Sequence, residues 1–159
     1  MTMHPIAHAA TRPDHPAVIM AGSGQQISYG DMEAQSNRFA HLLRAHRINQ
    51  GDAFAVLLEN RIEYFTLIWG SQRAGTMLVP ISSRLTAPEA AYIIRDAQVK
   101  LLITSGYFAG ILGDIRKQCP GLTVLVMDSG DAEDFAAALA AQAPTPIPDQ
   151  RAGMVILYS

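Results

Sequence analysis

The sequence predicts an α/β fold, with a mainly parallel sheet covered by helices on both faces. Three observations support this prediction. Short apolar runs alternate with helix-like segments along the chain. The run 53–58 has no polar alternation, which is typical of a strand buried on both sides. Residues 75–86 join two helix-like segments through an apolar run that ends in a proline and a polar turn, as expected of a parallel strand that delivers a loop to a ligand site.

A hairpin and a long helix are predicted first. Residues 18–27 indicate two short strands around a glycine turn. Ser28 is expected to begin the helix, because its hydroxyl can accept an N–H of the first turn. The helix carries apolar side chains at helical spacing and is predicted to end before Gly51, with Asn49 in the left-handed conformation at its exit.

The middle of the chain predicts a strand, a helix and a second strand. After the strand over 53–58, a helix is expected to begin at Asn60. Its side chains are apolar nearly all round, so it is expected to pack on more than one side. The next strand is predicted over 77–81.

A capping box marks the following helix. Thr86 can cap it, Pro88 stands where no intrahelical N–H is needed, and Glu89 can bond back to the cap. This helix is predicted to run to about Ala97. The elements expected after it are a strand over 100–104, a helix over 107–118 and a strand over 122–127. Such alternation predicts parallel strands joined by crossovers.

The pattern weakens after this last strand. An acidic turn precedes an alanine-rich helix over 135–141. Residues 143–153, with three prolines, predict a surface connector to an apolar final strand over 154–159. The whole chain, 1–159, is predicted to be a single incomplete domain, and its exposed sheet edge provides a route to self-association.

Composition excludes several classes of function. Hydrophobic residues make up 49% of the chain and charged residues 16%, with a net charge of −2, so neither disorder nor binding to nucleic acid is expected. The single Cys119 can form no internal disulfide and lacks the spacing of a metal or redox pair. No signal peptide is apparent, and no apolar stretch reaches the ~18 residues that span a bilayer. A cytoplasmic protein with a small-molecule or protein partner is expected.

An ordered set of short motifs covers nearly the whole chain. The set comprises residues 27–32, 37–40, 51–52, 56–60, 74–75, 79–81, 84–86, 89, 92–94, 96 and 100–104. With these motifs in this order, the chain resembles the N-terminal region of the adenylate-forming superfamily, and within it the AMP-forming acyl-CoA synthetases. Residues 156–159 are similar to the strand before the family's Ser/Thr/Gly-rich phosphate loop, so the chain is expected to stop just before that loop.

The resemblance implies a two-step reaction. A carboxylic acid, fatty or aryl, attacks the α-phosphate of Mg-ATP to give an acyl-adenylate, and the CoA thiol then displaces AMP. ATP, Mg²⁺ and CoA are therefore the expected cofactors of the parent enzyme. Because the family places most of its nucleotide and acid contacts further along the chain, this portion is expected to hold no catalytic residue, to be inactive alone, and to bind none of the three tightly.

Arg84 is the one residue to which the resemblance assigns a function. In related CoA ligases the arginine at this motif position lies near the CoA phosphates. The physical argument is that a guanidinium offers forked donors that suit phosphate oxygens. The alternative interpretation is a solvated arginine just before a helix, paired with Glu89.

Histidine and glycine groups suggest other sites only weakly. His4 and His8 are spaced to share a helical face, but no carboxylate or cysteine completes a metal site with them. The turn Gly22-Ser23-Gly24 lacks the lysine and the following helix of a phosphate loop, so a hairpin turn is the simpler interpretation.

Two further groups, one aromatic and one acidic, can each be interpreted either as a ligand site or as ordinary structure. Tyr64, Phe65 and Trp69 can line an acyl pocket, although aromatics on an apolar helix usually belong to the core. A group of carboxylates invites a cation site, but an acidic turn is the commoner arrangement. This group is Asp128, Asp131, Glu133 and Asp134.

Two other classes of protein stay open at this point. One is a freestanding flavodoxin-like domain that binds a nucleotide or a protein through the loops after Leu58, Ile81 and Met127. The other is a packing module completed by a partner chain that supplies the rest of the sheet.

Overall fold

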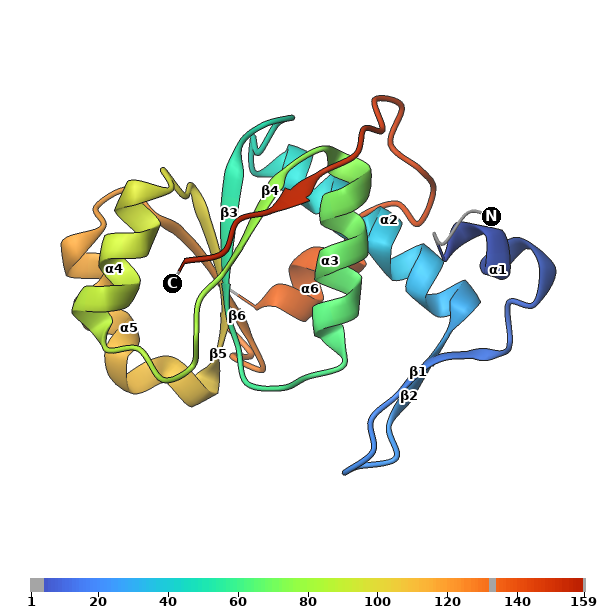
Figure 1. Cartoon of the computed structure of the whole chain (residues 1–159), viewed down its shortest axis with the longest axis horizontal. Helices are drawn as coiled ribbons and strands as arrows, with labels where there is room; N and C mark the ends of the chain where they lie inside the picture. The colour runs from blue at the N-terminus through green and yellow to red at the C-terminus, as the bar shows by residue number, and fades with distance from the viewer. Residues whose placement is uncertain (1–4, 132–133, 159) are drawn as a thin grey trace.

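A five-stranded parallel sheet forms the centre of the computed structural model, which describes residues 5–131 and 134–158 (Figure 1). Its strands are β3 (Ala53–Leu57), β4 (Met77–Pro80), β5 (Leu101–Ser105), β6 (Thr123–Met127) and β7 (Met154–Val155). They are arranged in the order β6-β5-β3-β4-β7, and every neighbouring pair is parallel. The predicted parallel sheet is therefore confirmed.

Helices cover both faces of this sheet. These are α2 (Tyr29–Ala45), α3 (Glu63–Ala74), α4 (Ala87–Asp96), α5 (Ala109–Gln118) and α6 (Phe135–Ala140), with a short 3₁₀ turn, η1 (Gly106–Phe108), before α5. A further helix, α1 (Ile6–Thr11), packs against α2 away from the sheet (Figure 1). Figure 1 shows α4 and α5 on one side of the sheet and α2, α3 and α6 on the other. The α/β class with helices on both faces is thus confirmed.

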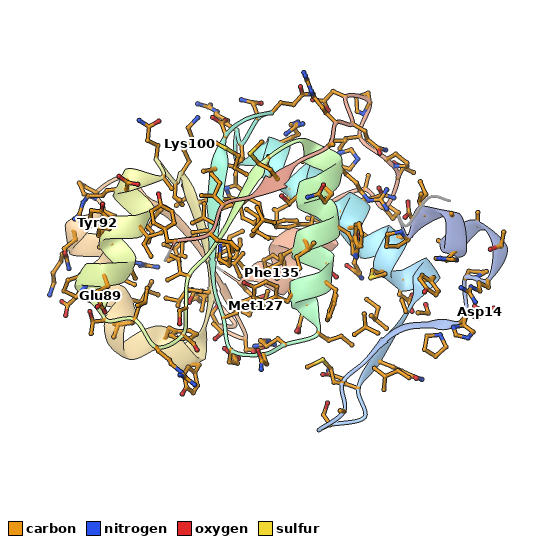
Figure 2. All side chains as sticks on the ribbon, in the orientation of Figure 1. Asp14, Glu89, Tyr92, Lys100, Met127 and Phe135 are labelled. Atoms are coloured by element: carbon orange, nitrogen blue, oxygen red, sulfur yellow. The ribbon has the colours of Figure 1, made fainter. Side chains whose placement is uncertain are left out.

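Two apolar cores result from the alternation of side chains along the strands. Phe54 and Val56 of β3 pack towards α2, α3 and α6, in the same cluster as Met127 and Phe135, which Figure 2 labels. The alternate residues of β3, which are Ala53, Ala55 and Leu57, pack on the opposite side, towards α4 and α5. Successive residues of a strand face opposite sides of a sheet, so an unbroken apolar run supplies both cores.

The helix starts follow the capping chemistry expected from the sequence. Ser28 ends the hairpin of β1 (Pro16–Ile19) and β2 (Gln26–Ser28), and its Oγ accepts a bond of 3.1 Å from the backbone N–H of Asp31. The Glu89 carboxylate accepts from the Thr86 N–H at 2.8 Å, which satisfies an otherwise unpaired donor at the start of α4.

Three details differ from the expectations. Arg47, not Asn49, takes the left-handed conformation (φ 59°) after α2, because the helix end is closed by a bond of 2.8 Å from the N–H of Ile48 back to the carbonyl of Leu43. Helix α3 begins at Glu63 rather than Asn60, since an ion-pair cluster around Arg61 holds the preceding residues. The face that α3 buries is also largely small or polar.

The connector over 143–153 lies on the surface, across α2 and α3, and Ile147 is its one fully buried side chain. It leads into β7, which pairs with β4 in the register Met77↔Met154. Ser159, the last residue of the predicted final strand, lies outside the described residues.

Candidate functional site at the carboxyl edge of the sheet

The carboxyl ends of the parallel strands meet at one edge of the sheet, where open α/β sheets bind their ligands. The loops at this edge are 58–62 after β3, 81–86 after β4 and 128–134 after β6, of which 132 and 133 lie outside the described residues. The turn η1 after β5 also lies here. The candidate site is therefore assembled from loops that are far apart in the sequence.

The loop 81–86 presents Arg84 to solvent. Ile81 anchors its start, with a backbone bond of 2.8 Å to Val56 and a buried side chain. Leu85 closes the turn through a bond of 3.2 Å from its N–H to the carbonyl of Ser82. Arg84 stands between these anchors and is exposed. A turn anchored at both ends thus carries an exposed cationic side chain.

Glu89 is not the partner of Arg84. Its carboxylate accepts hydrogen bonds from both the hydroxyl (2.7 Å) and the N–H (2.8 Å) of Thr86, and these bonds lower the pKa of Glu89. Among the ion pairs of residues 5–131 and 134–158, none involves Arg84. The pairing of Arg84 with Glu89 is therefore ruled out, and the guanidinium is exposed to solvent, an arrangement shared by a solvated arginine and by one that awaits an anionic ligand.

Two open grooves adjoin this loop, and Pro80 and Ser82 line both of them. The first has a volume of about 500 Å³ and runs along α4 beside the end of the chain, between Tyr92, Leu157 and Tyr158. Figure 2 shows Tyr92 and Glu89 on α4, on the side of the sheet away from α3. The second groove, of about 610 Å³, lies against α3.

The aromatic residues of α3 fall between the two roles that the sequence suggests. Tyr64 packs partly against the core, and burial raises its pKa. Phe65 is 36% exposed and lines the second groove together with Tyr64. Trp69 is half-buried and does not line that groove. Tyr64 and Phe65 therefore form a wall of the second groove, whereas Trp69 does not. The spacing of the three residues in the sequence does not by itself separate a groove wall from core packing.

A cluster around Arg61 closes the edge between β3, β5 and β6. Its guanidinium pairs with Glu63 at 3.0 Å, with Glu59 at 3.3 Å and, through a shorter contact, with Asp128. Glu59 in turn accepts a bond of 2.5 Å from the Ser105 hydroxyl of β5. Hydrogen bonds from Asp128 and Glu63 raise the pKa of Arg61. The guanidinium is thus a fixed counter-charge for three carboxylates.

This cluster lies at the point where successive strands are added on opposite sides of β3. Strand β4 lies on one side of β3 and β5 on the other, so the loops after β3 and β5 diverge there. Such a crevice is the usual ligand site of flavodoxin-like folds. Here the Ser105 hydroxyl at the end of β5 donates to Glu59 after β3 across the crevice, which argues against the freestanding flavodoxin-like alternative.

Asp128→Asn is expected to lower the free energy of unfolding by about 0.5 kcal/mol at pH 7, because the side chain is 69% exposed and solvent screens the pair. The hydrogen bond from Arg61 lowers the pKa of Asp128 below its unfolded value of about 3.9. The stabilisation is therefore complete above about pH 5 and is lost as the pH falls through the folded-state pKa. Urea titrations from pH 3 to 7 measure it; a difference that grows on acidification contradicts the assignment.

The other candidate residues have structural roles where they are described. The residue His8 contacts the ring of Tyr29 at 4.9 Å, while His4 lies outside the described residues. Gly24 adopts φ 71° in the hairpin turn, which confirms the hairpin interpretation. Asp134 caps α6 by accepting the N–H of Ala137 at 2.8 Å.

No metal cluster is found in the described part of the chain, where no three His, Cys, Asp or Glu side chains are grouped to hold an ion. Glu133, a member of the predicted acidic turn, lies outside the described residues. The Arg61 cluster was not anticipated from the sequence. The charged string from Glu59 to Glu63 was its only local signal, since Asp128 lies 67 residues away.

Comparison with known proteins decides the family. A family model described as AMP-binding enzyme matches residues 6–159. The chain belongs to the AMP-binding enzyme family. The resemblance carried by the short motifs is thereby confirmed over nearly the full length of the chain.

Relatives of this AMP-binding chain include acid ligases. The fatty acid–acyl-carrier-protein ligase ScoC of Streptomyces coeruleorubidus is 33% identical over 122 residues, which are 77% of this chain and 23% of the relative. The long-chain-fatty-acid–CoA ligase FadD13 of Mycobacterium tuberculosis is 34% identical over 110 residues, or 69% of this chain and 22% of the relative. The chain thus spans less than a quarter of the length of these relatives.

The fold agrees with a solved structure of the same family. The crystal structure of the N-terminal domain of FACL13 from Mycobacterium tuberculosis superposes with a TM-score of 0.80 and 30% identity, over 91% of this chain and 37% of that one. The AMP-binding chain therefore corresponds to the N-terminal portion of such ligases. A helix long and apolar enough to cross a bilayer does not occur within the described ranges.

Proposed function

We propose that the chain is the N-terminal part of an ATP-dependent acyl-CoA synthetase. The match of the AMP-binding family over residues 6–159 carries this proposal, and the fatty-acid ligases among the relatives support it. The parent enzyme joins a carboxylic acid, fatty or aryl, to CoA. Its substrates ATP and CoA belong to the cytoplasm, where we place the enzyme.

The reaction that we propose has two balanced steps. A carboxylate oxygen attacks the α-phosphorus of ATP, and pyrophosphate leaves with the electron pair of the broken P–O bond. The sulfur of CoA then attacks the acyl carbon, its proton passes to solvent, and AMP leaves with the electron pair of the broken carboxyl C–O bond. Mg²⁺ neutralises charge on the triphosphate in the first step; the described residues offer no grouped ligands for it, so we assign its protein ligands to the rest of the parent enzyme.

The contribution of this chain is a scaffold, a wall of the substrate region and Arg84. The parallel sheet places the loop 81–86 and both grooves at the ligand-binding edge. Because the chain spans less than a quarter of the length of its ligase relatives, we expect the 159-residue chain to be inactive alone and to bind ATP and CoA weakly. Its exposed sheet edge, with Met154 57% exposed, offers a surface for self-association.

Pyrophosphate exchange tests the proposal. Labelled pyrophosphate is expected to enter ATP when decanoate or benzoate is added to the parent enzyme, which contains this chain, and not when either is added to the 159-residue chain. Exchange by the short chain contradicts its proposed inactivity. A parent enzyme that shows neither exchange nor acyl-CoA formation with a panel of fatty and aryl acids contradicts the acyl-CoA synthetase assignment.

Arg84→Ala in the parent enzyme is expected to raise the KM for CoA about tenfold, because a charge-assisted bond to phosphate is lost. The KM for ATP and the rate of pyrophosphate exchange are expected to stay nearly unchanged. Arg84→Lys is expected to recover part of the loss, since lysine keeps the charge without the fork.

Arg95→Ala is a matched control for Arg84, because Arg95 lies near the opposite end of α4 and donates to the Gln118 carbonyl at 3.3 Å. Steady-state kinetics with varied CoA measure all three variants. An unchanged KM for CoA in Arg84→Ala establishes the solvated-arginine interpretation instead.

A further inference from the structure

The connector before β7 is held to α2 by side-chain bonds to its backbone. Asn37 donates to the carbonyl of Pro144 at 3.0 Å, and His41 lies 2.9 Å from the carbonyl of Thr145. Arg38 donates to the carbonyl of Ala140 at 2.9 Å, at the end of α6 and just before the connector. Side chains of α2 therefore hold a segment about one hundred residues further along the chain.

Arg44 joins three segments at the end of this path. Its Nη1 donates to the carbonyl of Ile48 at 2.8 Å, and its Nη2 donates to the carbonyl of Ala74 at the end of α3 at 2.7 Å. Its Nε and Nη2 both donate to one carboxylate oxygen of Asp149, at 3.1 and 3.0 Å. Gln50 adds a bond of 2.9 Å to the backbone carbonyl of Asp149. Asp149 is thus held through both its side chain and its main chain.

The chain then passes closely over the end of α3. Arg151 donates its N–H to the carbonyl of Arg73 at 2.9 Å. A Cβ on Gly153 would lie 2.5 Å from the carbonyl oxygen of Ser71 and 2.6 Å from that of Thr76. Both obstacles are backbone atoms, so a side chain at this position would displace the connector from α3.

Strand β7 contributes little to its own placement. It has two residues, Met154 and Val155, which are 57% and 46% exposed. Backbone bonds of 3.1 Å from Met154 to Thr76 and of 2.9 Å from Ile156 to Leu78 join it to β4. So short an edge strand has little apolar burial with which to resist a shift along its neighbour.

The residues that follow β7 nevertheless supply one wall of the first groove. Leu157 and Tyr158 line it opposite Leu85 and Tyr92. The Tyr158 hydroxyl donates a bond of 2.6 Å to Asp96, so the wall is also tied to the end of α4. A one-residue shift of β7 along β4 would move these side chains by about 3.3 Å along the groove, the rise of one strand residue.

We propose that Arg44 and Asp149 are a positioning pair, which fixes the register of β7 against β4 and thereby places Leu157 and Tyr158 as the wall of the 500 Å³ groove. Gly153 is the second element of this arrangement, because its lack of a Cβ permits the close passage over the end of α3. The inference stands independently of the proposed function, since it concerns how the chain is held.

Hydrogen exchange at single-residue resolution tests the pair in the 159-residue chain. In Asp149→Asn, the amides of Met154 and Ile156 are expected to exchange about threefold faster, as the loss of a partly exposed ion pair allows local opening. Amides of β3 and β5 are expected to keep their rates. Asp149→Glu retains the charge and is expected to restore most of the protection.

Asp114→Asn provides a matched control, because Asp114 forms an exposed ion pair with Lys117 at 2.9 Å on α5, remote from β7. It is expected to leave exchange in β7 unchanged. Gly153→Ala is expected to accelerate exchange at Met154 and Ile156 more than about tenfold, because backbone atoms obstruct the new Cβ.

Two results would overturn the inference. One is equal exchange at Met154 and Ile156 in the wild type, Asp149→Asn and Gly153→Ala, including the case in which none of the three is protected. The other is faster exchange throughout the sheet in Asp149→Asn, which would show a general loss of stability rather than a local release of β7.

Discussion

Glu33→Ala is expected to lower the free energy of unfolding by about 3 kcal/mol or more, the largest effect of any single change considered for this chain. Arg73, on the buried face of α3, has a side chain that is 1% exposed and pairs with the carboxylate of Glu33 on α2. Removal of that carboxylate leaves a guanidinium buried without a counter-charge. Urea unfolding followed by circular dichroism measures the loss.

The remaining donors of Arg73 explain why the loss is expected to be severe. Its Nε and Nη1 are buried and have no hydrogen-bond partner, so the bond to Glu33 must offset most of the desolvation cost of the guanidinium. Asn37 donates to the other oxygen of Glu33 at 3.1 Å and orients the carboxylate. Glu33 therefore stabilises the contact between α2 and α3 mainly because it neutralises the buried charge of Arg73.

A double substitution separates this account from a simple loss of packing. Arg73→Met removes the cation, and Glu33→Leu combined with Arg73→Met is expected to recover most of the stability lost in Glu33→Ala, because no buried charge remains. A double variant as unstable as the sum of its single substitutions contradicts the explanation. Glu33→Gln, which keeps an acceptor but not the charge, is expected to fall between Glu33→Ala and the wild type.

Gly70→Ala is expected to destabilise the chain by about 2 kcal/mol, despite the higher helix propensity of alanine. A Cβ at Gly70 would lie 2.6 Å from Cδ1 of Phe39 and 2.9 Å from the backbone oxygen of Ser36. Phe39 cannot retreat freely, because its ring packs against Phe54 with centroids 5.4 Å apart. Helices α2 and α3 would therefore have to separate.

Gly113→Ala is the matched control for Gly70→Ala, since Gly113 lies within α5 and a Cβ there meets nothing within 4 Å. It is expected to stabilise the chain by about 0.5 to 1 kcal/mol through helix propensity alone. Thermal and urea unfolding of both variants give the comparison. A neutral or stabilising Gly70→Ala would show that α2 and α3 pack less tightly than their contacts indicate.

Local patterns predicted the elements well because their causes are local. The unbroken apolar run of β3 required burial on both faces, and two distinct cores enclose it. The capping chemistry of Ser28 and Thr86 placed the starts of α2 and α4 within one residue. Each of these signals depends on neighbours in the sequence, which the sequence itself supplies.

Helix α3 shows where such patterns fail. Its apolar side chains suggested packing all round, yet Phe65 is exposed, while Gly70, Ser71 and Arg73 are buried. Periodicity identifies an apolar face but not a close helix contact, which favours small residues and here includes a compensated charge. The partner of that contact, α2, lies beyond any local window.

The sequence by itself determined the family, the order of strands and helices, and Arg84 as the residue to test, because ordered motifs and short-range chemistry carry that information. Only the tertiary structure decided that Glu89 is bound to Thr86, that Arg61 holds Asp128, and that Arg44 holds Asp149 beside β7. The physical reason is distance along the chain. A charge in the sequence indicates the need for a partner, whereas the fold selects which of several distant partners meets it.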